Sequence, residues 1–78
     1  MARFYFHYRD GTDRLDKEGV ELAGPEQARA MAVLSSGEAM LDLGSTFWSS
    51  PEWGFWVTDE SGATVCSLAV RGTLGHAV

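Results

Sequence analysis

The chain has 78 residues, of which 45% are hydrophobic and 12% aromatic, and its formal net charge is −5. This length makes a single small domain with a thin core, and the apolar fraction excludes a disordered chain. Because six basic residues are scattered among eleven acidic ones, the charge disfavours nucleic acid or an anionic membrane as a partner.

Residues 3–9 predict the first β-strand. Phe4, Phe6 and Tyr8 alternate with Tyr5 and His7, which is the period of a strand with two different faces. The dipeptide at 10–11, Asp-Gly, then predicts a tight turn. We expect an irregular return strand, in which 14–16 pairs briefly, 17–19 turns or bulges, and 20–22 resumes the extended backbone.

A helix is predicted to begin at Pro25, because Pro at the first helical position loses no needed hydrogen bond. It should run to about Leu43 and stop at Gly44. Its apolar residues do not fall on one face, and the Ser-Ser-Gly run at 35–37 lowers the helix propensity of its middle. We therefore expect either a kink at 35–37 or apolar contacts on both faces of the helix.

Residues 45–54 predict an aromatic-rich connector, and a second hairpin follows, with strands at 55–58 and 63–70. The order ββ-α-ββ predicts an α+β fold, a four-stranded, mostly antiparallel sheet with one helix packed on one face. We predict the strand order 2-1-4-3, which places the aromatic first strand in the centre. Residues 1–71 are expected to form the single domain, and 72–78 a flexible C-terminal tail.

No arrangement of residues predicts catalysis, a cofactor or a metal. The stretch from Asp10 to Glu21 has the length of a calcium loop, but Arg14 and Leu15 stand where that loop needs an oxygen ligand and a Gly. Cys66 is the only cysteine and alternates with apolar residues, which favours a place in the core. We therefore expect a protein that is not an enzyme.

All three tryptophans lie within the ten residues from 47 to 56. This cluster either closes one end of the core or anchors a partner, since Trp is enriched in interface hot spots. For the second case we name Phe47, Trp48, Trp53 and His7 as the candidate interaction surface, with His7 on the solvent face of its strand or at an interface. The alternative is a small-ligand-binding protein, in which the aromatic residues from Phe47 to Trp56 line a pocket and His7 or Tyr5 orients the ligand.

Motifs in three parts of the chain carry a family resemblance. They are Arg3-Phe4-Tyr5-Phe6-His7 with Arg9-Asp10-Gly11; Asp16, Glu18-Gly19-Val20-Glu21-Leu22 and Ala28-Arg29; and Val57-Thr58-Asp59-Glu60-Ser61-Gly62 with Leu68. With these motifs the chain resembles a short bacterial family of unknown function from rhizobium-like proteobacteria. The resemblance covers nearly the whole chain but is weakest in the middle of the helix and the Trp-rich connector. It implies no activity, cofactor or catalytic residue.

Charged residues interrupt any apolar run near the N-terminus, and no segment approaches the ~20 apolar residues of a membrane helix. We therefore expect a cytoplasmic protein. The leading hypothesis is a non-catalytic module that acts through protein contacts, with itself as a partner in a homo-oligomer, and not through nucleic acid or a membrane.

Overall fold

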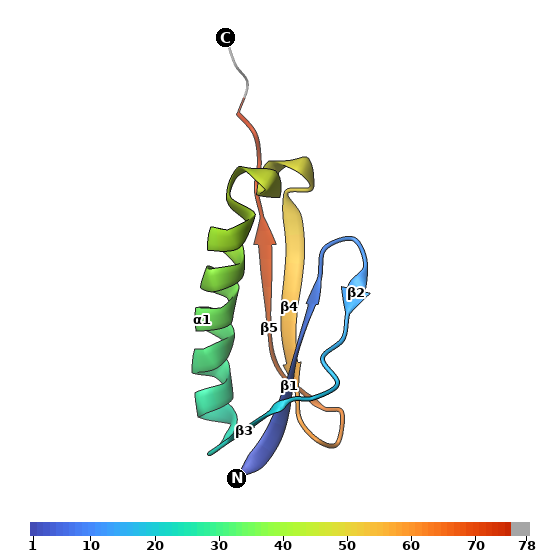
Figure 1. Ribbon diagram of the computed structural model, residues 1–78, viewed down its shortest axis with the longest axis vertical. Helices are drawn as coiled ribbons and strands as arrows, with labels where there is room; N and C mark the ends of the chain where they lie inside the picture. Colours follow the sequence, from blue (N-terminus) through green and yellow to red (C-terminus); the bar gives the residue numbers. More distant parts are fainter. Residues whose placement is uncertain (76–78) are drawn as a thin grey trace.

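In the computed structural model, which describes residues 1–75, five strands form one antiparallel sheet and one helix runs along one of its faces (Figure 1). The elements in chain order are β1 (Ala2–Arg9), β2 (Asp13–Arg14), β3 (Val20–Leu22), α1 (Pro25–Leu43), the 3-10 helix η1 (Gly44–Ser49), β4 (Glu52–Thr58) and β5 (Thr64–Arg71). The α+β class, the single α-helix on one face and the antiparallel sheet are thus confirmed, but the predicted count of four strands is wrong, because the return strand after β1 is divided into β2 and β3. Residues 72–75 form neither helix nor strand, and the rest of the predicted tail lies outside the described residues.

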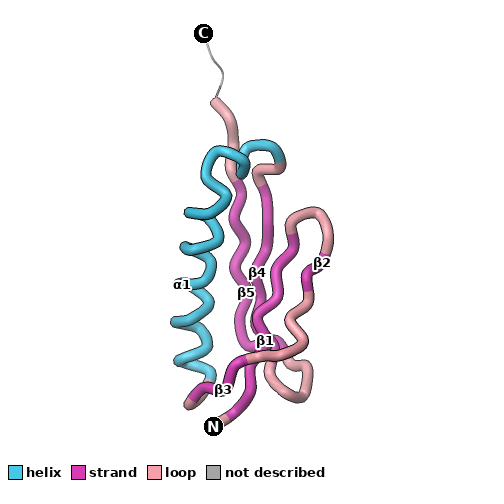
Figure 2. Tube along the Cα trace, in the orientation of Figure 1, coloured by secondary structure: helices cyan, strands magenta, loops and turns pink. Residues whose placement is uncertain are grey.

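β1 lies in the interior of the sheet, with β2 and β3 along one edge and β4 along the other (Figure 2). The predicted irregular return strand is present as two short strands. β2 pairs with the end of β1, opposite Tyr8 and Arg9, and β3 pairs with its beginning, opposite Ala2 to Phe4. Between them, residues 15–19 leave the edge of β1 and return to it.

The predicted strand order is wrong at one place. β4, and not the last strand, lies beside β1, and β5 forms the outer edge of the sheet. β4 also begins at Glu52, so residues 52–54 belong to a strand and not to the connector. β4 sends Trp53, Phe55 and Val57 into the core, whereas the apolar residues of β5 are only half-buried. β4 is the more completely buried strand because it has a neighbouring strand on each edge, whereas β5 has only one neighbour in the described part of the chain.

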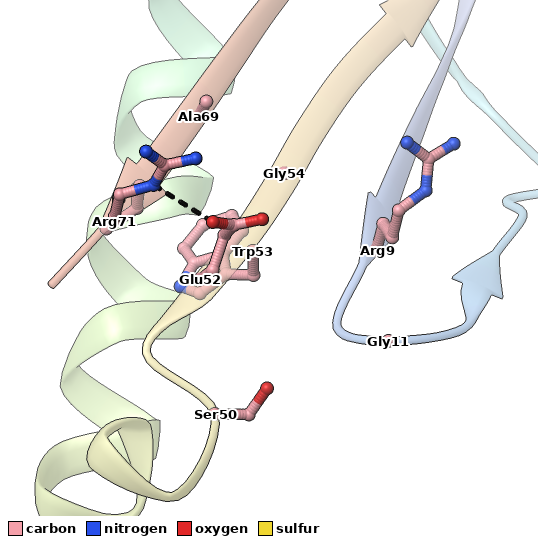
Figure 3. A pocket seen from close by; sticks show the side chains of 9 residues that line it. Arg9, Gly11, Ser50, Glu52, Trp53, Gly54, Ala69 and Arg71 are labelled. Carbon is pink, nitrogen blue, oxygen red and sulfur yellow. Dashed lines mark hydrogen bonds and ion pairs between the residues drawn. The ribbon is translucent and has the colours of Figure 1, made fainter.

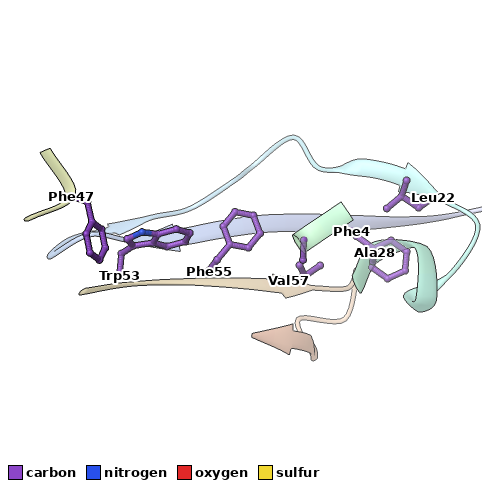
Figure 4. Packing of buried hydrophobic residues seen from close by; sticks show 8 residues of the cluster. Phe4, Leu22, Ala28, Phe47, Trp53, Phe55 and Val57 are labelled. Carbon is purple, nitrogen blue, oxygen red and sulfur yellow. The ribbon is translucent and has the colours of Figure 1, made fainter. Parts of the chain in front are cut away.

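The core lies between α1 and the face of the sheet that α1 covers. Trp53, Phe55 and Val57 form a row along β4, with Phe47 of η1 at one end of the row (Figure 4). Phe4, Leu22, Ala28 and Ala32 complete the set of buried apolar residues. Half-buried residues of β5 and α1 pack around this set, Cys66 and Met40 among them. Cys66 therefore points toward the core, as predicted, but it lies at the margin of the core and is only half-buried.

α1 begins at Pro25 and continues through residues 35–37 to Leu43, so the predicted bounds are confirmed and 35–37 does not end the helix. Gly44 follows with φ 52°, and its N–H donates to the carbonyl of Met40. Residues at a spacing of four, Ala28, Ala32 and Ser36, are buried against the sheet. The opposite side carries an outer stripe of exposed small and apolar residues: Ala30, Val33, Leu34, Gly37 and Leu41. Leu41 is 81% exposed, and no described residue covers this stripe.

Candidate functional site

The face of the sheet away from α1 carries a hydrogen-bonded cluster around His7. The Nδ1 atom of His7 accepts the backbone N–H of Asp16 at 3.1 Å, so this nitrogen carries no proton. The proton is therefore on Nε2, which lies 2.9 Å from the Thr58 hydroxyl oxygen and donates to it. The ring also lies against Trp56, with 5.1 Å between the centroids.

Asp16 holds the other end of this cluster. Its carboxylate accepts three backbone N–H groups, those of Phe6 (3.1 Å), Glu18 (3.0 Å) and Gly19 (3.1 Å). Burial alone would raise the pKa of Asp16, but the three backbone hydrogen bonds outweigh burial, and the pKa is lowered. Asp16 therefore remains a carboxylate and fixes the chain between β2 and β3 to the edge of β1.

His7 is thus a structural residue in this fold. Both of its ring nitrogens have partners from the domain itself, and the residue is only 8% exposed. The expectation that it lies on the solvent face is corrected, because the chain at Asp16 and Thr58 encloses the ring. A base or a metal ligand needs a free nitrogen, and His7 offers none without the loss of one of these bonds.

The other three residues of the predicted interaction surface lie at the far end of the core. Phe47 and Trp53 are buried, and the indole N–H of Trp53 donates to the sulfur of Met40 at 3.0 Å. Trp48 packs edge-on against Phe47 and is 45% exposed. The structure therefore brings Phe47 and Trp48 together but places His7 on the opposite face of the sheet. Trp48 is the one member of the set with substantial exposed surface.

Cys66 faces α1 from β5, and burial raises the pKa of its thiol, an effect that Arg29 partly offsets. A raised pKa leaves little thiolate, which is the reactive form. Within residues 1–75, no group of three His, Cys, Asp or Glu side chains is placed to hold a metal ion. The same part of the chain holds no helix long and apolar enough to span a membrane.

A hollow of about 640 Å³ opens over the end of the sheet, on the face away from α1 (Figure 3). Arg9 and Arg71 stand on either side of Gly54, whose missing side chain helps to leave the space. Both guanidinium groups already have partners, because Arg9 pairs with Asp13 and Arg71 pairs with Glu52 at 2.9 Å. This hollow therefore offers no uncompensated charge to a ligand.

A second cavity, a cleft of about 340 Å³, lies between the end of α1 and the end of β1. It is lined by Tyr8, Asp10, Ala39, Asp42, Leu43, Thr46, Trp53 and Phe55. The predicted aromatic pocket thus has a counterpart that includes Trp53 and Phe55 but neither His7 nor Tyr5. Tyr8 and Asp42 were not predicted from the sequence. An acidic residue in the last turn of a helix, where a basic one is favourable, was a signal that could have identified Asp42.

The family model described as Domain of unknown function (DUF6894) matches residues 3–71, and the chain belongs to this family. This match confirms the resemblance to a family of unknown function. No curated protein and no solved structure matches the chain.

Proposed function

We propose that this member of the family is a non-catalytic module that acts through protein contacts, and that its partner is a second copy of the same chain. The observation that supports the proposal is the free edge of β5. β5 pairs with β4 along one edge, and no strand within residues 1–75 pairs with the other. An unpaired strand of eight residues is a template for a further strand unless something blocks it.

β5 has few of the features that block edge pairing. It contains no Pro or Lys, its only charged residue is Arg71 at its end, and its irregularity is confined to its start. The opposite edge of the sheet is different, because β2 and β3 have only two and three residues and the chain leaves the edge between them. β5 is therefore the edge at which the sheet can be extended.

The backbone of β5 has a self-complementary register. The N–H of Gly72 donates to the carbonyl of Pro51 in the direction of β4, so by alternation the N–H and C=O groups of Ser67, Ala69 and Arg71 point to the free edge. An antiparallel pair with its two-fold axis at Ala69 uses all three residues from each chain. This pair forms about six backbone hydrogen bonds between the two copies.

The side chains fit this register as well. Ala69 meets its own copy across the axis, and Arg71 lies opposite Ser67, so no like charges are opposed. On the side that α1 covers, Leu68 lies opposite Val70, and both are only half-buried in the single chain. Opposed apolar pairs of this kind are the unit of stabilisation between antiparallel strands.

The position of α1 makes the contact larger than a strand pair. Because α1 packs against both β4 and β5, we infer that its axis runs about midway between the two strands, half a strand spacing inside β5. With ~4.8 Å between strands, two copies joined at β5 bring their helices to about 10 Å, which is the ordinary distance of packed helices. Arg29 lies on the flank of α1 over β5, near Cys66, and Val33, on the same flank at the margin of the outer stripe, is exposed in the single chain.

The mass of the chain in solution tests the proposal. We expect light scattering to give twice the chain mass of 8.5 kDa. Ala69→Pro should give the single mass, because Pro removes an N–H that points away from β4 and is tolerated at such edge positions. Ala69→Thr is the matched control, and we expect it to remain a dimer. A single mass for the unaltered chain would overturn the proposal.

A cross-link locates the interface. In a Cys66→Ser background, Ala69→Cys places two thiols across the axis with about 5.5 Å between the Cα atoms, which a disulfide can span. Ala30→Cys places the thiol on the outer stripe of α1 instead. We expect oxidation to join the first variant and not the second. The reverse result would assign the contact to the outer stripe and refute the β5 interface.

A further inference from the structure

The cleft between α1 and β1 is a concave apolar site that the fold leaves open. Because α1 packs on β4 and β5, it does not cover the end of β1, and Tyr8 remains 41% exposed there. The volume of about 340 Å³ lies at the lower end of the range of small-molecule sites. The cleft lies on the flank of α1 away from β5, so it is separate from the proposed dimer contact.

Aromatic rings form much of the cleft. Trp53 and Phe55 lie at its base and pack edge to face, with 6.3 Å between the ring centroids. Tyr8 and Leu43 form its more exposed walls, and the small side chain of Ala39 leaves room between them. Such a lining accepts an apolar body, and the faces of aromatic rings attract cations.

The charges that line the cleft are negative. Asp42 comes from α1 and Asp10 from the turn after β1. Arg14 partly neutralises Asp10, with 3.7 Å between its Nε atom and the carboxylate. Asp42 forms no ion pair with any residue in 1–75, and no Lys or Arg lines the cleft.

The end of α1 adds a second and independent argument. The C-terminus of a helix is the negative end of its dipole, and a positive charge there is favourable. The last turn of α1 contains no basic residue and contains Asp42, which has the unfavourable sign. A cation bound in the cleft would compensate both the carboxylate and the dipole.

We infer that this cleft binds a small organic ammonium ion whose apolar part lies on Trp53 and Phe55 and whose charge lies near Asp42. An anion of the same size would meet two carboxylates and a helix C-terminus. The hollow over Gly54 does not compete for such a ligand, because its charges are already paired within the chain. The volume of the cleft suits a ligand of about ten non-hydrogen atoms.

Three probes of one shape test the inference: 2-phenylethylammonium, the neutral 2-phenylethanol and the anionic phenylacetate. They are titrated into the full chain while the amide signals and the indole N–H signals of the tryptophans are followed by two-dimensional NMR. We expect the ammonium ion to bind at least about tenfold more tightly than the alcohol, and phenylacetate not to bind. The shifts should concentrate at Ala39, Asp42, Thr46 and the indole of Trp53.

Asp42→Asn separates the charge from the shape of the cleft. We expect it to weaken binding of the ammonium ion about tenfold and, without ligand, to raise the thermal midpoint. Glu38→Gln removes one charge from the same helix outside the cleft and should leave binding unchanged. Equal binding of ammonium ion and alcohol, shifts elsewhere in the molecule, no binding of any probe, or unchanged binding by Asp42→Asn would each overturn the inference. The same titrations repeated with Ala69→Pro, the variant expected to be a monomer, make the result independent of the oligomeric state.

Discussion

The carboxylate of Asp16 takes the place of a missing strand. β3 pairs with β1 as far as Phe4 and β2 pairs from Tyr8 onward, so the N–H of Phe6 faces a gap between them. Asp16 fills this gap by accepting that N–H, and it also accepts the N–H groups of Glu18 and Gly19. Its removal should therefore loosen the whole edge formed by residues 13–22.

The expected loss can be worked out from these bonds. A hydrogen bond to a charged group contributes about 1.5–3 kcal/mol when shielded, but the N–H groups of Glu18 and Gly19 can turn to water after substitution. We therefore expect Asp16→Ala to lower the free energy of unfolding by about 2–3 kcal/mol. Asp16→Asn keeps one oxygen but turns an NH₂ group toward Phe6, so about 1–2 kcal/mol should be lost. A loss of this size in Asp16→Ala lowers the thermal midpoint by roughly 10–20 °C in a domain of this length.

The pH dependence gives a second measure of the same interaction. The pKa of Asp16 is lower in the folded chain than the ~3.9 of an unfolded Asp, so the folded state favours the carboxylate. This contribution is fully present above the unfolded pKa and is lost as the pH falls through the lower, folded pKa. We expect the unaltered chain to lose more stability than Asp16→Asn upon acidification below about pH 4.

The assay is urea unfolding followed by tryptophan fluorescence, at neutral pH and at a series of acidic pH values. Glu38→Gln is the matched control, since it removes an exposed carboxylate from α1 that makes no hydrogen bond among those described, and its midpoint should stay close to that of the unaltered chain. A loss below about 0.5 kcal/mol in Asp16→Ala, within the range of ordinary surface substitutions, would refute the reasoning.

Four further substitutions concern stability and use the same unfolding measurement. Gly19→Ala should cost at least about 2 kcal/mol, because φ is 72° and an added Cβ would lie 2.9 Å from the backbone oxygen of Phe4; an unchanged midpoint would contradict this. Ser36→Ala should stabilise by about 1 kcal/mol, since the hydroxyl is buried without a partner in the described chain, and Gly37→Ala, in open space on the helix, by about 0.5–1 kcal/mol. His7→Ala should cost about 2–3 kcal/mol by unpairing two hydrogen bonds and removing a buried ring; a smaller loss would refute its structural role.

The elements whose ends are set by local chemistry could be predicted well. Pro25 and Gly44 mark the ends of α1 because each acts within one turn of its own position. The alternation of aromatic residues likewise predicts the two faces of β1. The start of β4 was missed because Pro51 and the serines before it suggest a loop, although Trp53 alternates with Phe55 and Val57 as a strand requires.

The candidate sites were less accessible to sequence reasoning. The Trp-rich segment drew attention to Phe47 and Trp53, which the fold buries, and away from Asp42 and Tyr8, which lie 34 residues apart and line one cleft only when α1 packs on the sheet. The free edge of β5 was also hidden. An edge strand and an interior strand have similar alternation, and the strand order alone distinguishes them.

The order of the elements, the ends of the helix and the class of the fold could be predicted from the amino-acid sequence alone, because each follows from turns, caps and periodicity among near neighbours. Tertiary structure decided which strand lies beside β1, which side of α1 is buried, and that His7 donates to Thr58, a residue 51 positions away. These outcomes depend on the pairing of segments that are distant in the sequence. The observed register is the one in which total burial and hydrogen bonding stabilise the sheet most. A local sequence pattern does not predict which of the alternative registers is the most stable.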